Sequence, residues 1–129
     1  MTTAIVCTGF LGLLVFGLGF AVSMTRGQTG THFGYTQDPA DRLYKMIRAH
    51  GSTTEYAPML AVLMLFLGSR SPATWVLWVM VIATACRYIQ ALGLIVPATL
   101  DKPHPLRMVG SAGTYLTGLL LCVAAFMAA

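Results

Sequence analysis

Four runs of apolar residues, separated by shorter polar segments, follow one another along the chain. The first run, residues 1–24, contains no charged side chain. At 1.5 Å per residue, a helix of that length crosses the roughly 30 Å hydrocarbon layer of a bilayer. The pattern predicts helices at about 2–25, 39–67, 73–96 and 106–127, with Gly- and Pro-containing loops between them. It therefore predicts an all-α fold, in which residues 1–129 form a single transmembrane domain built as a four-helix bundle.

The ends and contact faces of these helices are also predictable. Arg26 and Gly27 are expected to close the first helix, and Asp38 to cap the second, with Pro39 in its first helical position. Small side chains in a membrane let neighbouring helices approach closely. We therefore expect close packing at glycines of the first and fourth helices, namely Gly9, Gly12, Gly17, Gly19, Gly110, Gly113 and Gly118.

Composition excludes the main alternatives to a membrane protein. Hydrophobic residues make up 57% of the chain and charged residues only 9%, with a mean hydropathy of +0.74. A soluble domain carries roughly a quarter charged residues, so a soluble enzyme and a disordered chain are both excluded. With so few charges, the net charge of +4 indicates positive loops at an anionic leaflet rather than a nucleic-acid partner. Cys7, Cys86 and Cys122 lie far apart in apolar runs, so we expect free thiols and no metal site.

The basic residues predict the orientation of the chain. The middle loop carries only Arg70, whereas the first and third loops and their edges carry most of the others. The positive-inside rule then places the first and third loops in the cytoplasm and both termini on the outer side. The basic residues that set this orientation are Arg26, Arg42, Lys45, Arg48, Lys102 and Arg107.

Charged residues within the predicted spans are the candidates for chemistry. A charge in the bilayer costs about 2.5–3.5 kcal/mol on insertion scales, so Arg48, Glu55 and Arg87 are expected to face the bundle interior. Arginines from all four helices gather at one end, which suits an anionic ligand. Alternatively, Glu55 forms a buried ion pair with Arg87 or Arg48 that only fixes helix register. Polar residues recur on one face of the second helix at spacings of three and four: Asp41, Lys45, Arg48, Ser52, Glu55 and Tyr56.

Three segments resemble the sequence signatures of one family. Residues 48–58, RAHGSTTEYAP, resemble the second-helix motif R-A-x-x-N-x-x-E-Y-x-P of the MAPEG superfamily, the membrane-associated proteins in eicosanoid and glutathione metabolism. Residues 87–90, RYIQ, resemble its third-helix motif R-Y-x-Q. Leu106 and Arg107, followed by Gly110 and Thr114, resemble the start of its fourth helix. The resemblance covers essentially the whole chain.

The resemblance implies a homotrimer of four-helix subunits that binds glutathione between neighbours near the cytoplasmic face. It implies a glutathione-dependent transferase or peroxidase acting on a lipophilic substrate that enters from the membrane lipid. Arg107, and less securely Arg26, match the arginines that stabilise the glutathione thiolate. No metal is implied. The residues implied to bind glutathione are Arg48, Ser52, Glu55, Tyr56, Arg87 and Tyr88.

Two positions depart from the family pattern. Ser52 stands where the motif has Asn, and Leu92 stands where a second tyrosine is expected four residues after Tyr88. Both departures favour an alternative function, a non-catalytic accessory subunit or a lipid-binding scaffold. A transporter or channel would need a continuous polar path, whereas residues 59–67 and 73–85 are almost entirely apolar. The R-A-H-G sequence is most similar to the bacterial branch, which implies a bacterial inner-membrane protein.

Overall fold

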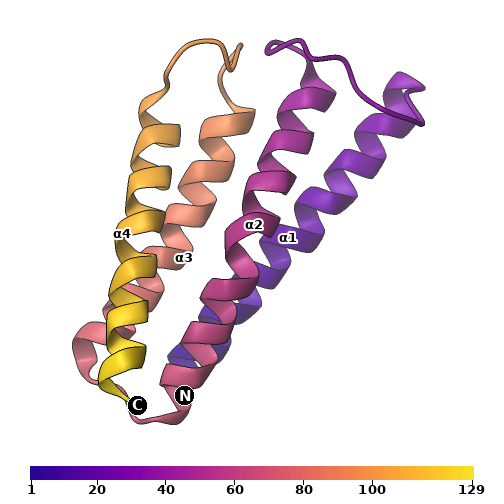
Figure 1. Cartoon of the computed structure of the whole chain (residues 1–129). Coiled ribbons are helices and arrows are strands. Elements are labelled where there is room, and N and C mark those ends of the chain that lie inside the picture. The colour runs from indigo at the N-terminus through magenta and orange to yellow at the C-terminus, as the bar shows by residue number, and fades with distance from the viewer.

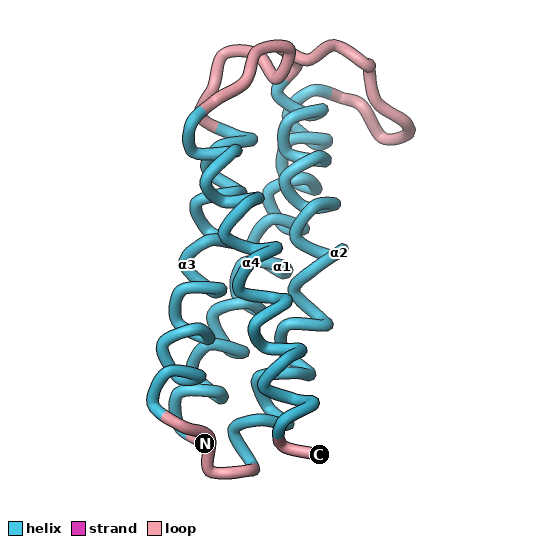
Figure 2. Tube along the Cα trace, turned by 60° about the vertical axis from the view of Figure 1, so that its left-hand side comes forward, coloured by secondary structure: helices cyan, strands magenta, loops and turns pink.

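The computed structural model describes all 129 residues as a bundle of four helices in up-and-down order. The helices are α1 (Thr2–Thr29), α2 (Arg42–Ser69), α3 (Thr74–Ile95) and α4 (Pro105–Met127). No strand is present. The two longer loops lie at one end, and both termini lie with the short α2–α3 turn at the other (Figures 1 and 2). This confirms the predicted all-α bundle.

The first two helices begin or end a few residues away from the predicted positions. α1 does not stop at Arg26 but continues to Thr29, where Gly30 adopts a left-handed conformation with φ of 66° and its N–H bonds to the Arg26 carbonyl. Asp38 does not cap α2. Asp41 is the N-cap, and its carboxylate accepts a 2.9 Å hydrogen bond from the Tyr44 N–H. Asp38 instead shapes the preceding turn, since its Oδ1 accepts a hydrogen bond from the Ala40 N–H.

The bundle consists of two tight helix pairs, α1 with α2 and α3 with α4, that pack side by side (Figure 1). α2 also contacts α3 across the bundle, whereas the backbones of α1 and α4 do not approach each other closely. Two further seams therefore lie on different sides of the molecule. We call them the α1–α3 seam and the α2–α4 seam.

Glycines allow α3 and α4 to pack closely. A Cβ at Gly110 would overlap the backbone of Gln90, and one at Gly113 would overlap the Cys86 sulfur. Gly93 faces the backbone of Arg107 in the same way. The prediction of close packing at glycines is thus confirmed for Gly110 and Gly113. Within the subunit it is wrong for three α1 glycines, which face open space: Gly9, Gly12 and Gly17.

Three helices, α1, α3 and α4, are long and apolar enough to cross a membrane. α2 is of similar length but is not among them, because its first half carries Arg42, Lys45, Arg48 and Glu55. Many large apolar side chains on the outside are exposed, such as Phe16, at 80%. A surface of this kind is suited to lipid rather than to water. The chain is an integral membrane protein whose polar half-helix lies at the loop end.

Candidate functional site

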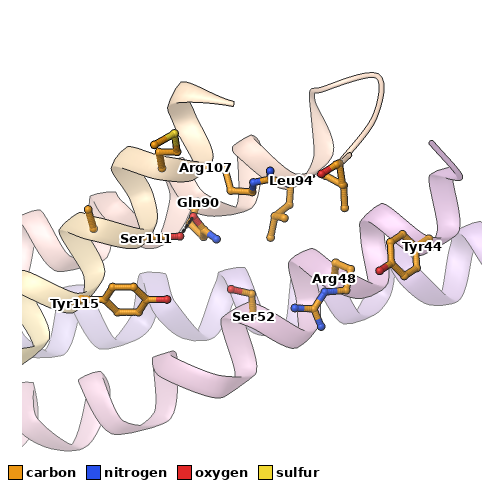
Figure 3. A pocket seen from close by; sticks show the side chains of 11 residues that line it. Tyr44, Arg48, Ser52, Gln90, Leu94, Arg107, Ser111 and Tyr115 are labelled. Atoms are coloured by element: carbon orange, nitrogen blue, oxygen red, sulfur yellow. Dashed lines mark hydrogen bonds between the residues drawn. The ribbon is translucent and has the colours of Figure 1, made fainter. Parts of the chain in front are cut away.

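A groove opens on the α2–α4 seam near the loop end of the bundle, with a volume of about 610 Å³ (Figure 3). We call it the polar groove. Its walls come from the first half of α2, the last turns of α3 and the first turns of α4, and no acidic side chain lines it. The lining residues are Tyr44, Arg48, Ser52, Gln90, Leu94, Leu100, Arg107, Met108, Ser111, Ala112 and Tyr115.

Two arginines approach the polar groove from different helices. Arg48 is exposed on α2 and lies along the same wall as Ser52 (Figure 3). Arg107 lies across the groove at the start of α4. Two guanidinium groups with no carboxylate among the lining residues form a site suited to an anion, because each can hold a carboxylate through two parallel hydrogen bonds.

Arg107 is held in place by the α3–α4 loop. Its Nη1 donates to the Leu100 carbonyl and its Nη2 to the Lys102 carbonyl, each at 3.1 Å. Pro105 in the first turn of α4 fixes where the helix begins, just before the arginine. These bonds orient the guanidinium without neutralising it, since carbonyls carry no net charge. The remaining N–H groups are left for a ligand.

The two loops at this end are tied to each other and to α2. The Leu100 N–H donates to the Pro39 carbonyl at 2.9 Å, and the Lys45 ammonium donates to the Pro97 carbonyl at 2.9 Å. Lys45 therefore holds the α3–α4 loop and does not line the groove. The predicted polar stripe of α2 is thus divided by role, with Asp41 capping the helix and Arg48 and Ser52 lining the groove.

Arg87 lies behind the groove wall with only 1% of its surface exposed. Its Nη2 donates to Ser52 Oγ at 3.2 Å and its Nη1 to Thr114 Oγ1 at 3.4 Å, so it connects α3 to both α2 and α4. The guanidinium also lies over the ring of Tyr56, 5.2 Å from the ring centroid. Its Nε has no hydrogen-bond partner. Arg87 therefore faces the interior, as expected.

Glu55 does not neutralise either arginine. It is exposed, and it does not line the polar groove. The buried ion pair considered from the sequence is absent from the subunit, because the buried Arg87 is held by Ser52, Thr114 and Tyr56 instead. The expectation that Glu55 faces the bundle interior is wrong for the single subunit.

Two other predicted site residues lie away from the polar groove. Tyr88 belongs to the α1–α3 seam, where its hydroxyl donates to the Phe10 carbonyl at 2.8 Å and its ring lines a separate apolar cavity of about 350 Å³. Arg26 folds onto the α1–α2 loop, with Nη1 donating to the carbonyls of Gly34 at 2.8 Å and Thr31 at 3.2 Å. The structure thus brings Arg48, Ser52 and Arg107 together, backed by Arg87 and Tyr56, but not the remaining three.

Three groove residues, Gln90, Ser111 and Tyr115, were not among the predicted site residues. Ser111 Oγ donates to Gln90 Oε1 at 2.8 Å, which leaves the Gln90 amide N–H groups available at the groove wall (Figure 3). Tyr115 completes the wall next to Ser111. A signal was present, because Arg107, Ser111 and Tyr115 are spaced by four and so share one face of α4.

No group of three or more His, Cys, Asp or Glu side chains could hold a metal ion in this structure. The three cysteines are free, with Cys7 and Cys86 buried. The groove is lined by two guanidinium groups, hydroxyls and an amide, and none of the cysteines lines it.

Fold and site together define a class of protein, a small integral membrane helix bundle with an arginine-lined groove at its loop end. The model of the MAPEG family matches residues 4–127, so the chain belongs to the MAPEG family. A search of curated proteins and a search of solved structures found no match.

Proposed function

We propose that this protein is a glutathione-dependent transferase or peroxidase that acts on lipophilic electrophiles or hydroperoxides. The observation that carries the proposal is the pair of arginines, Arg48 and Arg107, lining a groove that has no acidic residue. Glutathione presents two carboxylates, which the arginines of such a groove can bind, and a thiol, which a nearby arginine can activate. The groove volume of about 610 Å³ lies within the roughly 300–1,000 Å³ of small-molecule sites.

The chemistry follows from the charge near the thiol. A thiol of pKa near 8.5 is mostly protonated at neutral pH, and an adjacent guanidinium favours the thiolate. Each unit of pKa depression requires about 1.4 kcal/mol of differential interaction. We assign this role to Arg107, whose guanidinium is already oriented by Leu100 and Lys102. Arg26 lies on the α1–α2 loop and would reach a ligand only after releasing Gly34 and Thr31.

The separation of predicted residues over two seams favours a site completed by a second subunit. The polar groove lies on the α2–α4 seam, whereas Tyr88 lies on the α1–α3 seam and Glu55 points outward. Placing the α1–α3 seam of one copy near the α2–α4 seam of the next would bring all of them to one ligand. We therefore propose that the working form is a homotrimer in a bacterial inner membrane, with the loop end in the cytoplasm.

A non-catalytic accessory subunit or lipid-binding scaffold is the second candidate. It is favoured by Leu92, an apolar side chain 50% exposed on α3, and by Ser52, whose hydroxyl accepts a hydrogen bond from Arg87. In this case the groove would hold an anionic lipid headgroup.

Calorimetric titration of glutathione into the detergent-purified protein tests the proposal. We expect saturable binding that Arg48→Ala and Glu55→Gln each weaken at least tenfold. Arg70→Ala is the matched control, since Arg70 lies at the opposite end of the bundle and stacks on Phe66. Absence of binding at millimolar glutathione by a folded protein would refute the proposal and favour the second candidate, which copurified lipid would then support.

A further inference from the structure

Tyr115 lines two cavities of opposite character on the α2–α4 seam. The first is the polar groove. The second, which we call the apolar groove, has a volume of about 380 Å³ and extends from Tyr115 toward the terminal end of the bundle. Tyr115 is the one residue that lines both. The apolar groove is lined by Tyr56, Met59, Leu60, Leu63, Thr114, Tyr115, Gly118, Leu119 and Cys122.

The position of the Tyr115 ring is fixed by a stack of side chains. Its ring lies 5.7 Å from the Tyr56 ring, centroid to centroid, at an interplanar angle of 60°. Tyr56 in turn lies under the guanidinium of Arg87, which is held by hydrogen bonds to two helices. Aromatic and cation–π contacts of this kind are attractive and depend on ring orientation, so they favour one placement of the ring. Although Tyr115 is 53% exposed, its ring therefore has a preferred place.

The hydroxyl of Tyr115 points into the polar groove, toward the region between Ser52 and Ser111 (Figure 3). Its ring forms the adjoining end of the apolar groove. A molecule that spans this junction would place an apolar chain on one side and a hydrogen-bond acceptor on the other. Tyr115 is thus positioned to contact whichever group of the bound molecule lies at the junction of the two grooves.

We propose that Tyr115 is the specificity-determining residue for the second substrate. Its O–H donates a hydrogen bond to a carbonyl oxygen conjugated with the reactive carbon, while the apolar chain attached to that carbonyl lies in the apolar groove. The proposal rests on the glutathione-dependent function above. It selects amphiphiles whose electrophilic carbon is conjugated with a carbonyl, such as α,β-unsaturated ketones, over simple alkyl electrophiles.

The reaction with an unsaturated ketone balances without a further co-reactant. The thiol proton leaves to solvent, and the thiolate forms a C–S bond at the terminal alkene carbon. The alkene π pair becomes the C=C bond of an enolate, and the carbonyl π pair moves onto the oxygen. Tyr115 donates its hydrogen bond to that oxygen as negative charge develops, and water returns a proton to the neighbouring carbon. An alkyl iodide reacts by forming the C–S bond and releasing iodide, with no oxygen for Tyr115 to contact.

Conjugation kinetics of glutathione with three probes test this assignment, after subtraction of the uncatalysed reaction. The probes are pentyl vinyl ketone, methyl vinyl ketone and octyl iodide. We expect Tyr115→Phe to lower kcat/KM for pentyl vinyl ketone about tenfold, the effect of one lost hydrogen bond, and to change that for octyl iodide less than twofold. Tyr35→Phe is the control, because Tyr35 lies on the α1–α2 loop and lines neither groove, and the change keeps its ring on Tyr44 of α2.

A second pair of variants tests the apolar groove itself. Leu63→Trp should reduce kcat/KM for pentyl vinyl ketone at least fivefold more than for methyl vinyl ketone, because the indole occupies space that the longer chain needs. Val62→Trp is the control, because Val62 is the adjacent, outward-facing residue and lines neither groove. It should leave the ratio of the two kcat/KM values unchanged.

The outcomes separate this inference from the function on which it rests. The unmodified protein could turn over the probes while Tyr115→Phe lowers kcat/KM equally for pentyl vinyl ketone and octyl iodide. That result would overturn the specificity role of Tyr115 but not the proposed function. If Leu63→Trp left the ratio of kcat/KM for pentyl vinyl ketone to that for methyl vinyl ketone unchanged, the placement of the substrate chain in the apolar groove would be overturned. No turnover above background by the unmodified protein, for any probe, would overturn the proposed function and this inference together.

Discussion

Arg87 and Ser52 are joined by a hydrogen bond of 3.2 Å, from the buried guanidinium on α3 to a hydroxyl that lines the polar groove on α2. The guanidinium has no carboxylate partner, although it is 1% exposed. Burying a charge without a counter-ion is costly. The arrangement therefore gives the groove wall a fixed hydroxyl and a positive charge behind it, at a cost in stability.

Two replacements of Arg87 separate the contributions of its packing and of its charge to the stability of the protein. We expect Arg87→Met to change the free energy of unfolding by less than about 2 kcal/mol, because the loss of two hydrogen bonds is offset by removal of an unpaired charge. Arg87→Ala should be less stable than Arg87→Met by about 2–3 kcal/mol, since it leaves a cavity among three helices. Unfolding in mixed detergent measures both. Equal stability of the two variants would contradict the packing role.

Because α3 and α4 pack closely at Gly110, a side chain added there should strongly destabilise the protein. We expect Gly110→Ala to destabilise the protein by about 3 kcal/mol, because the new Cβ would overlap the Gln90 backbone, which cannot move aside cheaply. Gly12→Ala is the matched control on a glycine that faces open space, and alanine there favours helix by about 0.5–1 kcal/mol. Thermal unfolding followed by circular dichroism compares them. A destabilised Gly12→Ala protein would show that this face of α1 is covered by another copy.

Local patterns along the chain were sufficient to predict the fold class, because the length and apolar character of each run determine whether a helix can cross a membrane. They did not settle the helix ends. The motif Asp38-Pro39 predicted a cap at Asp38, whereas Asp38 makes a turn with Ala40 and the helix begins three residues later, with Asp41 as its cap. The choice depends on where the chain must enter the bundle, which no local motif encodes.

The site was only partly predictable, because local patterns do not encode how the helices are arranged. Spacings of three and four correctly placed Arg48 and Ser52 on one face of α2. Glu55 has nearly the same angular position as Arg48 but lies two turns further along the helix, where its side chain is exposed and lines neither the polar groove nor the apolar groove. Which neighbour a helix face meets depends on the order and crossing of the helices, and periodicity alone contains neither.

The distribution of basic residues predicts the orientation of the loop end. In a protein with Cys7, Cys86 and Cys122 replaced by serine, we expect Ser69→Cys to react with a membrane-impermeant maleimide on intact cells. Phe33→Cys, on the exposed first loop, should react only after the cells are opened. The reason is that Arg and Lys near the loop end favour the cytoplasmic leaflet. The opposite labelling pattern would reverse the assigned topology, and labelling of both sites on intact cells would indicate a mixed one.

The role assigned to Arg107 predicts a shift in the pH dependence of turnover. In the unmodified protein, activity should rise with pH through an apparent pKa below that of a free thiol, which is near 8.5, because the guanidinium favours the thiolate. In Arg107→Ala the apparent pKa should move up toward 8.5, so activity near pH 7 falls most and part of it returns near pH 9. Arg42→Ala, an exposed arginine at the start of α2 outside the groove, is the control. Rate profiles of glutathione conjugation between about pH 6 and pH 9.5 make the comparison. A uniform loss of rate at every pH would contradict thiolate stabilisation, since a purely positional role for Arg107 would leave the profile unshifted.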